Sequence, residues 1–432
     1  MLRFLSARRL RALRVLSAHW QRRAIFLLGG IVVGAAAVAL ALLADQAQIL
    51  FARLLGHSRY ASLLVTPAGF ILSAFLTNRF FQNSQGSGIP QAIAARQLTD
   101  QAARGRLVSI RIAIGKILLT LLGLLCGASV GREGPTVQVG SSIMFAIGRM
   151  SPRRQPGLIL AGAAAGVAAA FNTPLAGIVF AIEEMSRAFE SRNTALVIGA
   201  VIAAGLTSLA LLGNYAYFGV NEAMLRNGID WLAILVCGVA GGFAGGCFSR
   251  ILIAVANIAP RGVTGLVKRQ PLLFAMVCGV VVALCGLASG DTIYGTGYAQ
   301  VKAALQGETP LPGSFGLLKF IATTASTVSG IPGGIFSPSL AVGGGIGANI
   351  AALFPGAPLG PIMLLGMVSY FAGVVQAPIT AFVIVIEMTD NHAMVIPLMM
   401  AALIAYSTSK LICPEGVYHA LSKNFLRAAP ER

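Results

Sequence analysis

The chain of 432 residues is 56% hydrophobic and only 11% charged, whereas about 25% of residues are charged in an ordinary soluble domain. This balance argues against a soluble domain and predicts an integral membrane protein. The net charge of +18 does not indicate nucleic-acid binding, because the basic residues gather at the N-terminus and in short connections between apolar stretches.

Residues 1–23 are the most basic part of the chain, with seven arginines among them. Segments rich in lysine and arginine beside a membrane span usually lie on the cytoplasmic side. We therefore expect residues 1–23 to form a basic cytoplasmic helix. The apolar run 24–44 that follows is long enough to span a bilayer. A cleaved secretory signal is not predicted, because the basic region is too long for one and the apolar run after it is long enough to cross the membrane.

Further apolar stretches recur to residue 412, but many of them are short. The runs 339–354 and 378–386 fall below the ~20 residues that a spanning helix needs, and the chain holds 51 glycines. Irregular backbone survives at membrane depth only where it lines a cavity or is buried in protein. The sequence therefore predicts broken or re-entrant helices that line a cavity.

One stretch, Gly131-Arg-Glu-Gly-Pro135, places two ionisable residues inside an apolar region. Such residues in a membrane protein face a cavity, a partner or a transported species. We expect Pro135 to be the first residue of a helix, which would put Glu133 at a positive helix end. The carboxylate there is either a helix cap or a plug that takes the place of an anion.

The second half of the chain repeats the plan of the first half. The matched positions are Lys116 with Lys319, Gly131 with Gly334, Pro174 with Pro378, and Glu183 with Glu387. An internal repeat of this size is typical of transporters whose two halves pack around a midplane site. We divide the chain into a first membrane repeat (24–215), a second membrane repeat (216–425) and a short C-terminal tail (426–432).

Three motifs carry a family resemblance: GSGIP at 86–90, GREGP at 131–135 and GGIFSP at 333–338. They resemble the anion-pathway signatures of the CLC family of chloride channels and chloride/proton antiporters, over about residues 25–425. The resemblance is to the prokaryotic type without cytoplasmic regulatory domains. It implies an all-α fold with an inverted repeat of tilted and broken helices, a homodimer in the bacterial inner (plasma) membrane, and both termini in the cytoplasm.

The resemblance also implies roles for individual residues. Glu133 would be the gating glutamate, Glu184 the proton acceptor on the intracellular side, and Glu183 a further residue of the proton path. The anion would be bound by Ser87, by the backbone N–H groups of Ile335 and Phe336, and by Tyr418. Plainer roles stay open for three of these: Ser87 as a helix cap, Glu184 as an interfacial charge paired with Arg187, and Tyr418 as an aromatic-belt residue.

The sequence thus predicts an antiporter that moves chloride across the membrane in exchange for protons. The alternative is a passive, gated chloride channel on the same fold, and the acid at Glu184 favours the antiporter because channel members usually have an apolar residue there. No motif indicates a sodium-coupled carrier or an enzyme. The four histidines and six cysteines lack ligand spacing, so no metal or cofactor is predicted. The predicted partners are chloride, protons, lipid and a second copy of the chain, and not nucleic acid.

Overall fold

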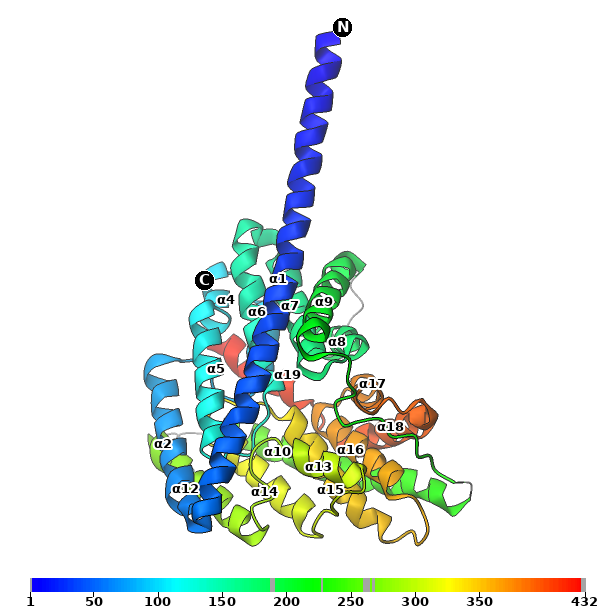
Figure 1. The fold of residues 1–432 in the computed structure, drawn as a ribbon. Helices are drawn as coiled ribbons and strands as arrows, with labels where there is room; N and C mark the ends of the chain where they lie inside the picture. The colour runs from blue at the N-terminus through cyan, green and yellow to red at the C-terminus, as the bar shows by residue number, and fades with distance from the viewer. Residues whose placement is uncertain (1, 187–190, 227, 259–264, 266–268, 429–432) are drawn as a thin grey trace.

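The computed structural model describes residues 2–186, 191–226, 228–258, 265 and 269–428. These residues form a bundle of helices, joined by short turns and two isolated β-bridges. Figure 1 shows the long α1 running down the bundle, with the last helix, α19, lying in its middle.

The described residues of the first half form nine α-helices and one π-helical turn, besides short 3-10 turns. They are α1 (Leu2–His57), α2 (Ser62–Phe80), α3 (Ile89–Gln97), α4 (Gln101–Leu107), α5 (Ile110–Leu125), α6 (Glu133–Ile147), α7 (Gln155–Phe171), α8 (Pro174–Phe180), η4 (Ala181–Ser186) and α9 (Ser191–Leu212). Because α1 is continuous from Leu2, no break separates the predicted basic segment from the first span.

The described part of the second half is helical in the same way. Its helices are α10 (Leu232–Ala256), α12 (Pro271–Ala288), α13 (Tyr298–Leu305), α14 (Phe315–Val328), α15 (Phe336–Ala351), α16 (Leu359–Val375), α17 (Pro378–Thr389), α18 (Val395–Ile412) and α19 (Val417–Arg427). The boundary between repeats at 215/216 falls in the irregular connection between α9 and α10, and the exact division stays a prediction.

The predicted broken helices are present at the same place in each half. After α7 the chain turns at Asn172, whose φ is 56°, and α8 begins at Pro174. After α16 it turns at Gln376, whose φ is 57°, and α17 begins at Pro378. A left-handed residue ends a helix, and a proline begins the next one without loss of a hydrogen bond.

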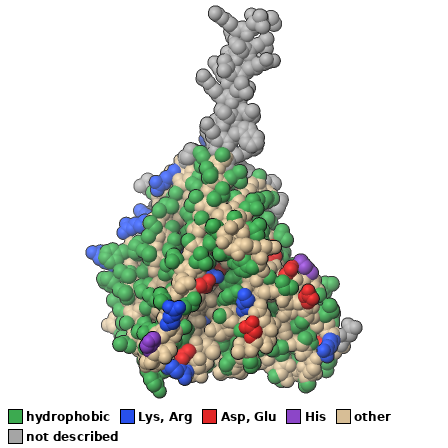
Figure 2. All heavy atoms as spheres, in the orientation of Figure 1, with side chains coloured by type: hydrophobic (Ala, Val, Ile, Leu, Met, Phe, Trp, Pro, Cys, Tyr) green, Lys and Arg blue, Asp and Glu red, His purple; other side chains and the backbone are tan. Residues whose placement is uncertain are grey.

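Seven helices of the described residues are long and apolar enough to cross a membrane, and they include 24–57 of α1, α9, α10 and α18. Their outward side chains are apolar, as at Leu64 and Leu206, which are 76% and 59% exposed. Figure 2 shows hydrophobic side chains spread over the visible face, with charged ones along its upper left edge and across its lower part. This surface matches a hydrocarbon environment.

Two pairs of loops join the halves at the centre of the bundle. The N–H of Gly131 donates to the carbonyl of Gly334 and the N–H of Gly334 donates back to Gly131, both at 2.7 Å. Beside them, the N–H of Gly86 donates to Ile331 and the N–H of Gly333 donates to Gly86. The three motifs found in the sequence therefore meet at one point, although more than 200 residues separate the first from the last.

Candidate functional site

Glu133 lies at this meeting point as the first residue of α6, and its side chain is fully buried. The hydroxyl of Ser337, at the start of α15, donates to one carboxylate oxygen. The other oxygen has no hydrogen-bond partner within the described residues. A Cβ at Gly131 would collide with this carboxylate, so the first glycine of the motif makes room for the side chain. Pro135 is the third residue of α6 and not the first.

Ser87 and Tyr418 bring two hydroxyls together next to this loop. Ser87 stands between Gly86 and Gly88, whose φ values of 62° and 97° favour glycine and present the serine just before α3. Tyr418 lies in α19, is fully buried, and interacts with Ser87. Neither hydroxyl oxygen has a hydrogen bond of normal geometry within the described residues. Two buried donors are therefore available to a ligand.

Ile335 and Phe336 begin α15 beside these hydroxyls, and both are buried. The first N–H groups of a helix have no acceptor within the helix, so this end is a place where an anion is favoured. The ring of Phe336 lies 6.0 Å from the ring of Tyr418 and 4.8 Å from that of Phe371. The four residues predicted to hold an anion thus lie in one cluster.

Glu184 lies in the π-helical turn η4 and is 3% exposed. His419, the residue after Tyr418, lies against it: its Nε2 is 2.8 Å from the Glu184 carbonyl oxygen and 3.7 Å from a carboxylate oxygen. Turns of this kind are rare and are frequent at functional sites. Arg187, the alternative partner considered from the sequence, lies outside the described residues.

Glu183 contacts the second half of the chain. Its carboxylate accepts hydrogen bonds from the backbone N–H groups of Ile379 and Thr380 and from the Thr380 hydroxyl, at 3.1, 2.6 and 2.8 Å. These are the first-turn donors of α17. Glu183 therefore caps a helix, and its predicted part in a proton path stays a prediction.

Four residues that the sequence did not single out contact this region: Ser337 lies against Glu133, His419 against Glu184, Tyr217 against Phe171 and Asp45 against Arg132. Arg132 is 5% exposed, and one of its guanidinium nitrogens donates to the Asp45 carboxylate at 2.7 Å and to the Ala41 carbonyl at 2.6 Å. Arg132 is thereby directed toward α1 and away from Ser87. Only the Ser337 hydroxyl lay within a recognised motif, as the serine of GGIFSP.

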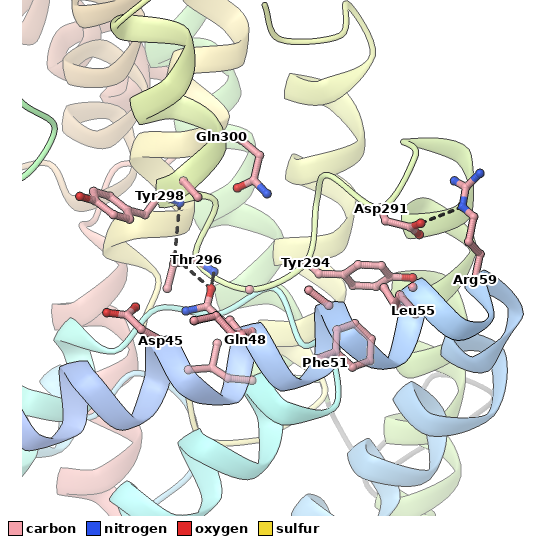
Figure 3. Close-up of a pocket in the computed structure, with 16 residues that line it drawn as sticks. Asp45, Gln48, Phe51, Leu55, Arg59, Asp291, Tyr294, Thr296, Tyr298 and Gln300 are labelled. Carbon is pink, nitrogen blue, oxygen red and sulfur yellow. Dashed lines mark hydrogen bonds and ion pairs between the residues drawn. The ribbon is translucent and has the colours of Figure 1, made fainter. Parts of the chain in front are cut away.

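A cavity of about 720 Å³ lies on the outside of this cluster, between the second half of α1 and the loop before α13. Figure 3 shows Asp45 and Gln48 on one wall and Thr296 and Tyr298 on the other, with the Arg59–Asp291 ion pair at the far end. The Gln48 side-chain oxygen accepts from the N–H of Thr296 at 2.9 Å. None of the predicted anion-binding residues lines this cavity. Asp45, which does line it, accepts a hydrogen bond from Arg132, the residue before Glu133.

Comparison with known proteins matches residues 68–410 to the family described as voltage gated chloride channel. The H(+)/Cl(-) exchange transporter ClcA of Yersinia pseudotuberculosis serotype IB is 34% identical over 84% of this chain and 78% of its own length. ClcA of Klebsiella pneumoniae (strain 342) is also 34% identical, over 84% of this chain and 80% of its own length.

Solved structures have the same fold. A slow cyanobacterial Cl⁻/H⁺ antiporter superimposes with a TM-score of 0.79 at 26% identity, over 94% of this chain and 98% of its own. A CLC-type fluoride/proton antiporter superimposes with a TM-score of 0.77 at 24% identity, over 93% of this chain and 97% of its own. The predicted arrangement of tilted and broken transmembrane helices is confirmed by this likeness.

Proposed function

The chain belongs to the voltage-gated chloride channel (CLC) family, and from this membership we propose that it exchanges chloride for protons, with Glu133 as a movable gate. The exchange activity named for its ClcA relatives supports the proposal. The observation that carries it is the position of the Glu133 carboxylate against the hydroxyl and the backbone N–H of Ser337.

This position is one that an anion can take in place of the carboxylate. The start of α15 carries the positive end of the helix dipole, and its donors are held at a buried place. The carboxylate comes from α6 of the other half, so it can withdraw without disturbing α15. When protonated, Glu133 loses the charge that holds it there, and the donors become free for chloride. One residue thus exchanges a proton for an anion.

The chloride itself is assigned to the Ser87 and Tyr418 hydroxyls and to the N–H groups of Ile335 and Phe336. Neutral donors of this kind bind an anion without the strong attraction of a lysine or arginine, which would hinder release. The two buried hydroxyls without hydrogen-bond partners support this assignment, because such groups are costly to bury unless something pairs with them.

Glu184 supports exchange over a passive channel. It is buried in η4, and His419, the residue after Tyr418, contacts it from α19. An ionisable residue at such a place in a membrane protein is costly and usually functional. We assign Glu184 as the proton acceptor that supplies Glu133 from the other side of the membrane.

The experiment is a flux measurement on purified protein in liposomes. A chloride gradient should drive proton movement uphill, and an opposing proton gradient should drive chloride. Glu133→Ala should keep chloride flux and abolish proton movement. Chloride flux with no proton movement in the unmodified protein would instead identify a passive channel. Fluoride in place of chloride serves as the control for anion selectivity, since one structural neighbour is a fluoride/proton antiporter.

We also assign a homodimer, with both termini in the cytoplasm. The starts of α8 and α17 leave Leu175 and Ile379 at the surface, 62% and 49% exposed, beside the carboxylates of Glu387 and Glu183. Partly exposed polar groups are poorly suited to lipid, and a second subunit would cover them. The mass of the protein in detergent tests the dimer. Protease access to tags at each end, in sealed vesicles, tests the orientation.

A further inference from the structure

Tyr217 is a fully enclosed side chain in the irregular connection between α9 and α10, at 1% exposure. Its ring packs edge-on against Phe171, with centroids 5.5 Å apart, and lies 4.4 Å from the ring of Tyr298. Its carbonyl oxygen accepts a hydrogen bond of 2.7 Å from the Tyr298 hydroxyl. Phe171 in turn stacks on Phe336 of the anion cluster. These contacts fix the direction of the Tyr217 ring.

The ring carries its hydroxyl to the gate. The hydroxyl lies beside that of Ser337, close enough for the charges of Glu133 and Arg132 to act on it. Within the described residues it forms no hydrogen bond of normal geometry. A buried hydroxyl without a hydrogen-bond partner destabilises the folded protein. If this side chain served only for packing, a phenylalanine at this position would give a more stable protein.

Ser337 has one hydroxyl hydrogen, and it is directed at Glu133. Its oxygen keeps lone pairs that can accept a hydrogen bond, and Tyr217 is the buried hydroxyl beside it. A donor to this oxygen polarises the Ser337 O–H and strengthens its bond to a negative group. In this chain of hydrogen bonds, the Tyr217 hydroxyl would donate to the Ser337 oxygen, and the Ser337 hydroxyl would donate to the anion.

We propose that Tyr217 is a positioning residue of the gate, which donates to Ser337 and so strengthens the hold of Ser337 on whichever anion lies there. That anion is the Glu133 carboxylate when the gate is closed and chloride when the carboxylate has withdrawn. The inference rests on the proposed function, since it takes Glu133 to be displaced by chloride. It adds a member to the gate from a part of the chain that holds none of the three motifs.

The test measures chloride binding with the carboxylate removed. In a Glu133→Ala protein the donors at α15 are open to chloride, and its dissociation constant is measured by titration calorimetry in detergent. Adding Tyr217→Phe deletes one oxygen and keeps the ring, so we expect chloride binding to weaken on the order of fivefold. The matched control is Tyr370→Phe, which also removes a buried hydroxyl without a hydrogen bond among the described residues, but from α16.

A third variant separates positioning from a structural role. If Tyr217 acts through Ser337, then Tyr217→Phe should have little further effect on chloride binding once Ser337→Ala is present, because the two changes remove the same interaction. Unchanged binding in Glu133→Ala/Tyr217→Phe, or equal weakening by Tyr370→Phe, would overturn the inference while leaving the proposed function standing. A Glu133→Ala protein that binds no chloride would overturn both.

Discussion

Glu183 and Glu387 are reciprocal helix caps that cross between the two halves of the molecule. Glu183, in the turn η4 that follows α8, accepts from the first N–H groups of α17. Glu387, within α17, accepts from the N–H groups of Leu175 and Ala176 at the start of α8, at 3.0 and 2.6 Å. Each carboxylate thus satisfies donors that the proline break leaves without acceptors. The matched spacing of the two Pro–Glu pairs in the sequence has this structural cause.

Removing one of these caps should destabilise the protein without stopping anion binding. Glu387→Ala leaves two helix-start N–H groups without acceptors, and hydrogen bonds to charged groups contribute about 1.5–3 kcal/mol. We expect a lower thermal unfolding midpoint in detergent and a chloride dissociation constant close to that of the unmodified protein. Glu308→Ala, at an exposed carboxylate, is the control. An unchanged midpoint for Glu387→Ala would show that the caps contribute nothing to stability.

Two buried lysines offer a matched pair of variants. Lys116 donates to the carbonyls of Ser84 and Gly86 at 2.7 and 2.5 Å, and Lys319 donates to those of Ile293 and Gly295, both at 2.7 Å. Each holds a glycine-rich loop before a short helix. Only the loop held by Lys116 carries Ser87, the serine that we propose binds the anion.

Replacing each lysine by methionine should therefore distinguish an effect on protein stability from an effect on chloride binding. Lys116→Met and Lys319→Met each leave two buried carbonyls without a donor, at about 1–3 kcal/mol per group, so both should lower the unfolding midpoint. Only Lys116→Met should also weaken chloride binding, because it loosens the loop that presents Ser87. Calorimetry and thermal unfolding in the same detergent measure both effects. Equal loss of chloride binding in the two variants would contradict this division.

Gly134 tests the geometry around Ser87 in another way. A Cβ at this position would collide with the Ser87 hydroxyl and lie 2.8 Å from the Ser87 carbonyl oxygen. Gly134→Ala should displace the hydroxyl and weaken chloride binding, with a stability loss of about 1–3 kcal/mol from overpacking. Gly199→Ala, where the nearest atom would be 3.5 Å away, should leave binding unchanged. Retained binding in Gly134→Ala would mean that Ser87 does not hold the anion.

The sequence predicted the helical membrane fold and the family, because glycine–proline motifs and a repeat are visible in the residue order. It also predicted which residues meet: Ser87, Glu133, Phe336 and Tyr418 lie in one cluster. It did not predict Tyr217, since the connection that holds this residue has no periodicity and no motif. Its role depends on contacts with Phe171 and Ser337, which are distant in sequence.

The capping role of Glu183 was missed for a similar reason. The repeat paired Glu183 with Glu387 correctly, but a repeat does not say which half each side chain contacts. Only the packing of α8 against α17 shows that the carboxylates cross over. The start of α6 was also predicted incorrectly. The sequence made Pro135 the first residue of the helix, but α6 begins two residues earlier, at Glu133.

The contact between His419 and Glu184 leads to the last prediction. His419 Nε2 lies 2.8 Å from the Glu184 carbonyl oxygen and 3.7 Å from its carboxylate, so it fixes the turn η4 that holds the carboxylate. His419 belongs to α19, which also carries Tyr418. A change at His419 should thus disturb Glu184, the proposed proton acceptor, while leaving the proposed anion-binding residues in place.

Glu184→Gln should abolish proton movement in liposomes and retain chloride flux, since glutamine keeps the shape but does not titrate. His419→Gln should slow proton movement and retain chloride flux, so that more chloride crosses per proton than in the unmodified protein. A direct comparison of the two fluxes in one vesicle preparation measures this ratio. If His419→Gln lowered both fluxes equally, the histidine would act on the whole pathway through α19 and not on Glu184, because only a loss confined to the proton step changes the ratio.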